Sequence, residues 1–440
     1  MADSVQTKRA KAFNLLFQDY DGPAFAVRLW DGWSWSSSPN HRPACTIVAE
    51  GPTALASLIA RPSQIALGEA YIHGELDVEG DLFSVFSVGE YLVNRPRNLV
   101  QRIVDKSAAA FFDLRQWLQR GTSHSRQRDR STIANTYDQP VEFYESWLGR
   151  SMGYTCAYFR NPDDSIDVAQ EQKFDLICRK LRLQPYERFL EIGCGWGGLL
   201  VHAAEKFGAD AQGVTLSQGQ AEATRGRIAR AGVEANCAVN LHDYRDLAVT
   251  DRPFDKVVSV GMFEHVGRKN HAQYFKIVHD LLRPGGVFLN HAIAWSASSS
   301  ARQSEFVDRF VFPDAHLVTL SQALSAAESA GLEVRDVENL REHYDLTLRQ
   351  WTEGLKRNAN RLMDHMSKAT YRTLLLCMAG SSAAFRRGDC CLYQVLFNRP
   401  DHGDSQLPLT REDLYAALPG KRPVASWAPS EPATQQTGSR

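Results

Sequence analysis

The sequence predicts an α/β protein in which a doubly wound parallel sheet forms the larger part of the chain and follows a smaller α+β domain. Strand-like apolar runs alternate with helical segments between residues 189 and 295, as in consecutive βαβ units. The first strand runs into a turn that spells G-x-G-x-x-G through Gly193, Gly195 and Gly198. Residues 1–120 lack this alternation and contain short strand patterns broken by Gly, Pro and Asp.

The composition is that of a soluble folded chain with room for two separate cores. Its 440 residues are 43% hydrophobic and 23% charged, and no window approaches the apolar length that crosses a bilayer. The start, MADSVQTKRAKAF, lacks the apolar region of a secretion signal, so we expect a cytoplasmic protein. The net charge of −1 gives no global attraction to nucleic acid, and we expect no such partner. The eight cysteines form no C-x-x-C pair, so we expect no metal site.

The amino-terminal domain is expected over residues 1–120. Strand patterns occur in FAVRLWDGWSWSS and CTIVAEG, and a helical pattern follows over residues 52–74. The acidic run GELDVEGDL indicates turns and helix caps. No catalytic constellation is visible in this domain.

A basic strip follows. Residues 95–130 contain nine Lys or Arg against three Asp, and their apolar residues recur at roughly helical spacing. A basic amphipathic helix of this kind would bind anionic bilayers; a linker helix docked on a neighbouring domain is the open alternative. Residues 121–133 are polar and charge-dense, as in a hinge, so the catalytic domain is expected over residues 134–400. Residues 419–440 are rich in Pro, Ser and Thr and are expected to be disordered.

The glycine turn admits two kinds of nucleotide. A hydride cofactor would require an acidic residue about 20 residues beyond the glycines, at the end of the second strand. That strand ends in Val214, Thr215, Leu216 and Ser217, without an acid. An S-adenosylmethionine fold instead has an acidic residue at the end of the first strand, where Glu191 stands. The turn therefore favours the Rossmann-like sheet of class I S-adenosylmethionine methyltransferases, with a ligand-free tight turn as the structural alternative.

The residues expected to contact this cofactor follow the strand ends, because the carboxyl ends of parallel strands meet at one rim of the sheet. Two of them have a structural alternative: Ser217 as the N-cap of the next helix and Asp243 as a turn cap. The candidates in this part of the chain are Glu191, Gly193, Gly195, Gly197, Thr215, Leu216, Ser217, Gln220, Asp243 and Tyr244.

Six further motifs occur in a fixed order. They are YDQPVEFYESWLGRSMGYTCAYF, LEIGCGWGG, GVTLSQGQ, FEHVG, FLNHAIA and YDLTLRQW. With LGEAYIHGELDVEGDL in the amino-terminal domain, the chain resembles the cyclopropane fatty acid synthases, relatives of the mycolic acid cyclopropane synthases, over nearly its full length. It departs from the family pattern at Thr136, where a His commonly precedes the first YD, and at Ala292, where Thr is usual.

The resemblance implies a reaction and a set of residues. Family members add the methyl group of S-adenosylmethionine to a cis double bond of a phospholipid acyl chain and close the ring by removing a proton, with bound bicarbonate as the base. The positions that hold bicarbonate match Cys156, Glu264, His291, Ile293 and Tyr344, and Tyr137 joins the cofactor-binding candidates. The resemblance also implies peripheral association with the inner face of the cell membrane, and a homodimer is an open expectation.

This chemistry makes physical demands on the site. An alkene is a weak nucleophile, so the sulfonium must be held close and aligned. Methyl addition leaves a carbocation, so water must be excluded and aromatic faces should line the pocket; the candidates are Tyr154, Tyr158, Phe159 and Phe263. We expect Glu264 to orient His291, because a carboxylate and bicarbonate would repel each other.

Several alternatives stay open. Cys156 could be a small buried hydrophobe, His291 could satisfy a loop carbonyl, and Glu264 could cap a helix. The same carbocation can also give a methylene group or a methyl branch. A methyltransferase of the same fold acting on a small soluble acceptor, and a catalytically silent lipid-binding protein, are the two competing functions.

Overall fold

The computed structural model describes residues 2–54, 63–94, 140–247, 252–298 and 317–415. Contacts group Met1–Gln406 into one compact unit and Leu407–Arg440 into a second. Tyr137, the basic strip over residues 95–130, the expected hinge over residues 121–133 and the tail over residues 419–440 lie outside the described residues.

The amino-terminal region contains a four-stranded sheet with the strand order β2-β1-β3-β4. The strands expected there are confirmed, but the interpretation of GELDVEGDL as turns and caps was wrong for residues 76–80. These residues form β4, whose Leu76 is buried and which pairs antiparallel with β3. The turn interpretation holds beyond the strand, where Asp81 accepts from the Phe83 N–H. The elements are α1 (Ala2–Leu16), β1 (Phe25–Leu29), β2 (Ser34–Ser36), β3 (Cys45–Ala49), α3 (Gln64–Ile72), β4 (Leu76–Gly80) and α4 (Val85–Asn94).

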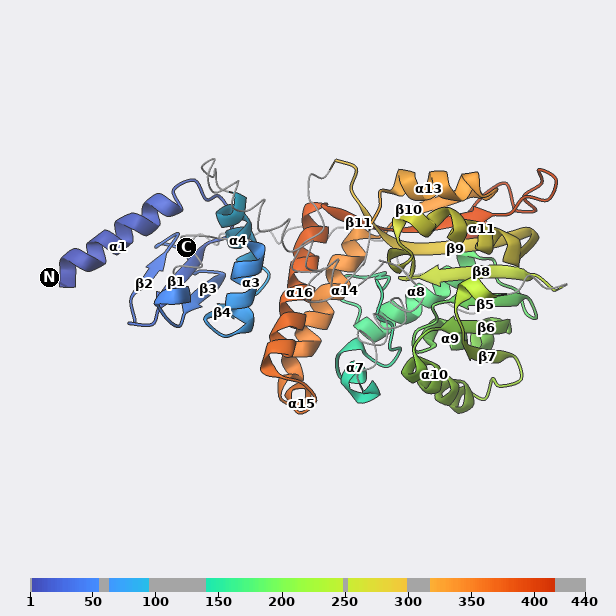
Figure 1. Ribbon diagram of the computed structural model, residues 1–440, viewed down its shortest axis with the longest axis horizontal. Helices are drawn as coiled ribbons and strands as arrows, with labels where there is room; N and C mark the ends of the chain where they lie inside the picture. The colour runs from blue at the N-terminus through green and yellow to red at the C-terminus, as the bar shows by residue number, and fades with distance from the viewer. Residues whose placement is uncertain (1, 55–62, 95–139, 248–251, 299–316, 416–440) are drawn as a thin grey trace, which may run out of the picture. The chain divides into compact units, whose positions relative to one another are not determined.

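The larger region is built on a seven-stranded sheet with the order β10-β11-β9-β8-β5-β6-β7 (Figure 1). The five strands from β5 to β9 pair in parallel, whereas β10 and β11 are antiparallel. This confirms the doubly wound Rossmann-like fold. The strands are β5 (Arg188–Ile192), β6 (Asp210–Thr215), β7 (Cys237–Leu241), β8 (Phe254–Val260), β9 (Leu282–Trp295), β10 (Glu333–Asn339) and β11 (Cys390–Asn398).

Strand β10 is an edge of this sheet among the described strands. Its register with β11 shifts between Val334 and Asp336, as at a β-bulge. Asp336 is buried and lies 3.8 Å from the ammonium of Lys180, which also pairs with Glu338. The strand therefore combines an irregular register with a buried charge.

Helices connect and cover the strands. The helices that alternate with strands β5 to β10 are α9 (Gly198–Phe207), α10 (Gln218–Ala231), α11 (His271–Leu281) and α13 (Leu320–Ser329), with short 3₁₀ turns η1 (Tyr244–Asp246), η2 (Phe263–His265) and η3 (Arg268–Asn270). The remaining helices are α7 (Val141–Leu148), α8 (Ile166–Lys180), α14 (Arg341–Arg357), α15 (Ala359–Met363), α16 (Lys368–Arg387) and α17 (Glu412–Tyr415). In the described ranges, no helix has the length and apolarity that crossing a bilayer requires.

Two hydrophobic cores lie against β9 and β11. One contains α11 and α13 and includes Tyr274 and Phe275. The other contains α7, α14 and α16 and includes Trp147 and Trp351. Because side chains alternate along a strand, His291, Ile293 and Trp295 of β9 share one face, and Ile293 and Trp295 pack on the second core. Tyr71 of α3 also belongs to this second core.

Candidate active site

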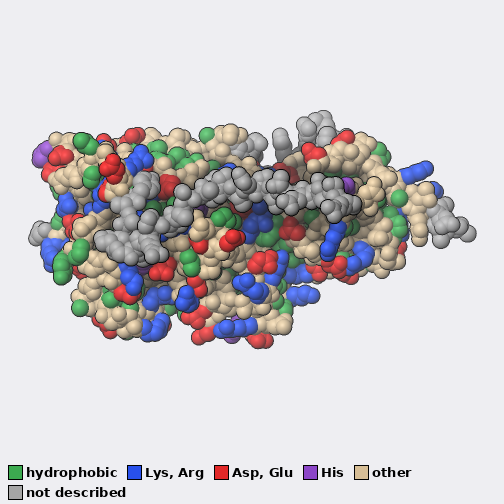
Figure 2. Space-filling view, turned by 180° about the vertical axis from the view of Figure 1, so that it is seen from behind, with side chains coloured by type: hydrophobic (Ala, Val, Ile, Leu, Met, Phe, Trp, Pro, Cys, Tyr) green, Lys and Arg blue, Asp and Glu red, His purple; other side chains and the backbone are tan. Residues whose placement is uncertain are grey.

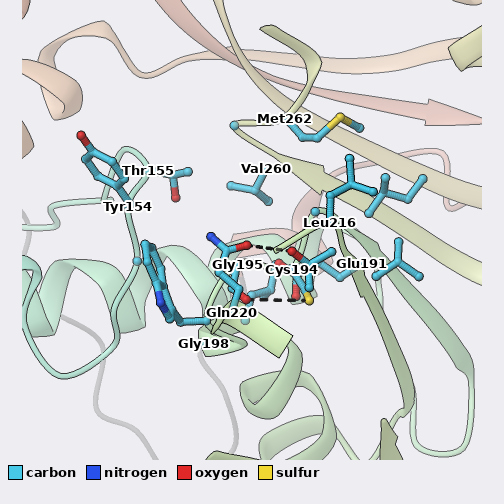
Figure 3. A pocket seen from close by; sticks show the side chains of 18 of the residues that line it. Tyr154, Thr155, Glu191, Cys194, Gly195, Gly198, Leu216, Gln220, Val260 and Met262 are labelled. Carbon is cyan, nitrogen blue, oxygen red and sulfur yellow. Dashed lines mark hydrogen bonds between the residues drawn. The ribbon is translucent and has the colours of Figure 1, made fainter. Parts of the chain in front are cut away.

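A cavity lies at the carboxyl ends of β5, β6 and β8, where the sequence places the cofactor (Figure 3). Thr215 at the end of β6 donates a hydrogen bond from Oγ1 to Oε1 of Gln220, at 2.7 Å. Seven of the predicted cofactor-binding residues line the cavity: Glu191, Gly193, Gly195, Thr215, Leu216, Gln220 and Tyr244. Tyr154 and Thr155, from the segment between α7 and α8, line it as well.

The glycines of the first turn serve different purposes. Gly195 has a φ of +52°, and a Cβ built on it meets no protein atom within 4 Å, because that space is the cavity. Gly197 has a φ of +77°, and its Cβ would lie 2.5 Å from Cγ2 of Thr224. Gly197 is the N-cap of α9 and does not line the cavity, so packing against α10 is sufficient reason for a glycine there.

Ser217 and Asp243 also lie off the cavity lining. The capping interpretation is confirmed for Ser217, whose Oγ accepts the Gln220 N–H at the start of α10. Asp243 accepts the Arg245 N–H and pairs with the Arg245 guanidinium at 2.6 Å. The turn-cap interpretation is therefore confirmed for Asp243 as well, at the start of η1, and its partner Arg245 lines the cavity.

Glu191 and Lys173 place two buried ionisable groups at the cavity. Oε2 of Glu191 is buried and has no hydrogen-bond partner among the described residues. Burial raises the pKa of Glu191 to about 8, against the attraction of Lys173. Burial likewise lowers the pKa of Lys173 to about 7, and its Nζ donates to Oγ1 of Thr155 at 2.7 Å. A buried carboxylate with an unused oxygen fits the cationic sulfonium and ammonium groups of S-adenosylmethionine.

Sequence reasoning missed Lys173. The signal was present in the spacing of α8, where Lys173 follows the buried Ala169 by four residues and precedes the buried Ile177 by four. A lysine on the apolar face of a helix is seldom buried without a specific partner.

The five residues that resemble the family's bicarbonate site are brought together by backbone contacts. The Ile293 N–H donates to Oε1 of Glu264 at 2.7 Å, and Ile293 pairs with Leu392 across β9 and β11. The Leu392 carbonyl accepts from the Leu340 N–H at the start of α14.

Leu340 continues this chain of contacts to the other two residues. Its carbonyl accepts from the Tyr344 N–H at 3.1 Å and from the Cys156 thiol at 3.8 Å. Although none of the five lines the cavity itself, Cys156 directly follows Thr155, and the Gly261 N–H at the cavity donates to the His291 carbonyl. The two groups of residues are therefore adjacent.

His291 and Glu264 each keep one polar atom unused. Nδ1 of His291 lies 3.2 Å from Nε2 of Gln394, while its Nε2 is buried without a partner in the described part of the chain. Oε2 of Glu264 is likewise buried without a hydrogen-bond partner among the described residues.

The expected contact between Glu264 and His291 is replaced by two others. Gln394 binds the imidazole and Glu264 binds Ile293. Strand β8 ends at Val260, opposite His291 of β9. The Ile293 N–H, further along β9, therefore has no backbone acceptor in β8 and donates to a side chain instead.

The protonation states follow from burial. Desolvation lowers the pKa of His291 well below its ordinary value, so the imidazole is neutral at pH 7. With the Gln394 amide donating to Nδ1, the imidazole proton lies on Nε2. Burial raises the pKa of Glu264 to about 7, against the Ile293 N–H that favours the carboxylate. Burial also raises the pKa of the Cys156 thiol far above neutrality, which disfavours a thiolate.

Aromatic rings gather beside this cluster. The ring of Tyr344 lies 4.6 Å from that of Phe385, and Tyr154 lies 5.3 Å from Trp351. The expectation that Phe263 belongs to this lining was wrong. Its ring packs 5.4 Å from Phe275 in the core beneath the other face of the sheet, because the tight 3₁₀ turn η2 sends Phe263 and the next residue in different directions.

Comparison with known proteins identifies the family. Residues 124–395 match the family model of mycolic acid cyclopropane synthetase, and residues 12–91 match a domain of unknown function. A probable fatty acid methyltransferase from Pseudomonas putida is 39% identical over 395 residues, covering 88% of this chain and 95% of the relative. The cyclopropane-fatty-acyl-phospholipid synthase of Escherichia coli is 31% identical over 342 residues, covering 78% and 85%.

A solved structure agrees in fold. The mycolic acid cyclopropane synthase CmaA1, crystallised with SAH and CTAB, superposes with a TM-score of 0.58 at 28% identity, covering 61% of this chain and 97% of that one. SAH is the form of S-adenosylmethionine that remains after methyl transfer. The chain therefore belongs to the mycolic acid cyclopropane synthetase family and is an S-adenosylmethionine-dependent methyltransferase that acts on lipids.

Proposed function

We propose that the protein alkylates a cis double bond in an acyl chain of a membrane phospholipid and forms a cyclopropane ring. The methyl carbon leaves the sulfonium and bonds to one alkene carbon, which leaves a carbocation on the other. Loss of a proton from that methyl group then lets the second carbon–carbon bond close the ring. The observation that carries the proposal is the pair of unused buried polar atoms, Nε2 of His291 and Oε2 of Glu264, beside both the aromatic cluster and the cavity.

The cavity supplies the donor side of this reaction. The unused oxygen of Glu191 would hold a cationic group of S-adenosylmethionine, and the bare backbone at Gly195 would let the ligand approach closely. Thr155 at the cavity and Cys156 behind it are neighbours in the chain, so methyl donor and alkene would meet along this segment. Such alignment accounts for much of the acceleration available to a weak nucleophile.

The aromatic cluster supplies the acceptor side. Tyr154, Tyr158 and Tyr344 pack against the core of α7, α14 and α16, where an apolar acyl chain is favoured and water is excluded. Aromatic faces also stabilise a cation by roughly 0.5–2 kcal/mol each. These rings would let the carbocation survive until a proton leaves.

The residues around His291 fit a small anion such as bicarbonate. The neutral imidazole presents an unused N–H donor, and Glu264, with its pKa raised to about 7, is partly protonated at neutral pH and then repels an anion less. Bound bicarbonate would supply the base for the final proton. In the described residues the Ile293 N–H is already used by Glu264, so an anion there would share or displace that bond.

The test is product analysis with labelled donor. The full chain would be incubated with vesicles of monounsaturated phosphatidylglycerol and S-adenosylmethionine carrying a trideuterated methyl group. We expect a ring that retains two deuterium atoms, identified by mass spectrometry, at a rate that rises with added bicarbonate. In a parallel reaction with unlabelled donor, the product should show the upfield proton signals of the cyclopropane methylene group. A product that retains all three deuterium atoms, or transfer to soluble amines without vesicles, would contradict the proposal.

A second product is favoured by one comparison. The Pseudomonas relative that covers 88% of this chain is named a probable fatty acid methyltransferase, and a methylene product also retains two deuterium atoms. In a parallel reaction with unlabelled donor, the proton signals of a terminal methylene group in place of the upfield cyclopropane signals would assign the reaction to this second class.

A further inference from the structure

The segment Gly153–Phe159 has no regular secondary structure although it joins the cavity to the aromatic cluster. Cys156, Ala157 and Phe159 are buried. Backbone N–H and C=O groups in such a segment lie outside the regular ladders of strands and helices and must find other partners. From α8, the Ala169 carbonyl accepts the Tyr158 N–H, and the Gln170 amide donates to the Gly153 and Thr155 carbonyls. The partners of these groups therefore decide where Tyr154, Cys156 and Tyr158 lie.

Helix α14 supplies partners from one face. His343, Thr347 and Gln350 follow one another at spacings of four and three residues, which places them in a row along the helix. Oγ1 of Thr347 accepts the Ala157 N–H at 3.0 Å and donates to the His343 carbonyl at 2.7 Å. Gln350 accepts the Ile166 N–H at 3.1 Å, where the segment leads into α8.

His343 makes two contacts with the segment. Its Nδ1 accepts the Phe159 N–H at 3.0 Å. Its ring stacks on Tyr158 with 4.7 Å between centroids and 17° between planes. Acceptance at Nδ1 requires that this nitrogen carry no proton, so the contact exists only while the imidazole is neutral.

The surroundings of His343 favour that neutral form. Burial lowers the pKa of His343, and this outweighs the opposing attraction of Glu338 in β10 and Glu342 in α14. Glu338 is itself paired with Lys180 of α8. On the side of the segment, His343 faces the ring of Tyr158.

We infer that His343 is a positioning residue, which fixes the backbone of Phe159 and the ring of Tyr158 so that the aromatic face lies correctly beside the reacting acyl chain. It acts through the segment and touches neither the donor cavity nor the cluster around His291. This inference rests on the lipid alkylation proposed above. Protonation of the imidazole removes the acceptor and releases the segment.

Two variants separate the acceptor from the ring. In His343→Asn the amide oxygen can take the place of Nδ1 and accept the Phe159 N–H, but it does not titrate. In His343→Phe the flat ring remains and can stack on Tyr158, but the acceptor is lost. His365→Asn, at an exposed position beyond α15, is the matched control.

The measurement is the rate of S-adenosylhomocysteine release by the full chain on vesicles of monounsaturated phosphatidylglycerol, across the pH range in which histidine titrates. Calorimetry of S-adenosylmethionine binding accompanies it. We expect His343→Phe to lower kcat by about tenfold, because a buried N–H is left unpaired, with unchanged affinity for S-adenosylmethionine. His343→Asn should retain most of kcat, and the ratio of its kcat to that of the parent should rise as pH falls.

The opposite results would overturn the inference. A folded His343→Phe protein with the parent's kcat would show that the acceptor is dispensable. If His343→Phe does not fold, the comparison of His343→Asn with the parent still decides, since a pH-independent ratio would rule out the neutral acceptor. A parent that releases S-adenosylhomocysteine without forming cyclopropane would refute the proposed function alone, because the ranking of the variants is measured independently of the product.

Discussion

At the residue scale, Glu191 links burial to ligand affinity. Its pKa is raised to about 8 by desolvation, so below that pH the carboxyl is largely protonated and cannot attract a cation. We predict that the affinity for S-adenosylmethionine rises with pH towards 8, by up to about tenfold per pH unit. Calorimetry at several pH values measures this.

Glu191→Gln is the control for this prediction. It should bind more weakly at pH 8 and lose most of the pH dependence. Any slope left in the variant belongs to Lys173, which titrates close to neutrality. A variant with the parent's slope would remove Glu191 from the cofactor site.

The first turn offers a second prediction at this scale. Gly195→Val should lose S-adenosylmethionine binding, because its side chain would enter the cavity. Both Gly195→Val and Gly197→Val place a branched side chain at a positive φ, but Gly197→Val should lower the melting temperature more, since its Cβ would also overlap Thr224. Scanning calorimetry with and without ligand separates the two, and a ligand-induced stabilisation of Gly195→Val equal to the parent's would contradict the assignment.

Cys156 gives a third prediction at the residue scale. Its thiol is fully buried, with a pKa raised far above neutrality by desolvation, and the carbonyls of Ala157 and Leu340 share its single hydrogen. A reactive thiolate is therefore disfavoured, and Cys156→Ser should retain substantial activity.

Tyr344→Phe should instead lower the apparent affinity for bicarbonate by about one to two orders of magnitude, if the phenol binds the anion. Rates against bicarbonate concentration in carbon dioxide-free buffer test both, and a dead Cys156→Ser protein with a bicarbonate-independent parent would point to thiolate chemistry.

At the element scale, helix α16 joins the two regions of the compact unit through Arg372. The guanidinium is buried, donates to the Tyr71 and Leu76 carbonyls, and lies 4.0 Å from the Tyr71 ring. We predict that Arg372→Met lowers the free energy of unfolding by roughly 2–4 kcal/mol, because buried carbonyls lose charged donors.

Denaturant unfolding measures this change. The exposed Arg361 on α15 provides the control, and Arg361→Met should leave stability nearly unchanged. Equal midpoints for the parent and Arg372→Met would show that the contact contributes nothing.

Helices and strands were predicted from the sequence more accurately than the contacts between side chains. The alternation from Phe189 onwards and the acid at Glu191 were enough to predict a cavity at the strand ends, because both depend on local order along the chain. The partners of Lys173 and His343 could not be predicted in this way, since both are fixed by tertiary contacts with the segment Gly153–Phe159. Lys173 contacts Thr155, 18 residues away along the chain, and His343 contacts Phe159, 184 residues away. The β4 strand was missed because its pairing with β3 outweighs an acidic, turn-like composition.

At the scale of the whole molecule, the distribution of charge bears on how the enzyme reaches its substrate. Acidic and basic side chains are intermingled on the face seen in Figure 2, in keeping with the net charge of −1. Attraction to anionic lipid must then come from a local source, and the basic strip over residues 95–130, outside the described residues, is the candidate.

We predict that the full chain co-sediments with anionic vesicles more than with neutral ones at low salt, since each basic residue near the surface contributes about 1 kcal/mol. Added salt should reduce the difference. Replacing the Lys and Arg residues of the strip by Gln should abolish it, and equal binding of the parent to both kinds of vesicle would refute the prediction.

The bulged strand β10 has a consequence for self-association. An exposed sheet edge offers unpaired N–H and C=O groups to the edge of another copy, and proteins prevent such pairing with bulges and inward-pointing charges. The shift between Val334 and Asp336, and the buried pairing of Asp336 with Lys180, provide both. Lys180→Met would remove an ammonium group that holds the Asp336 carboxylate in place, so it would weaken one of the two features that keep this edge from templating amyloid-like growth.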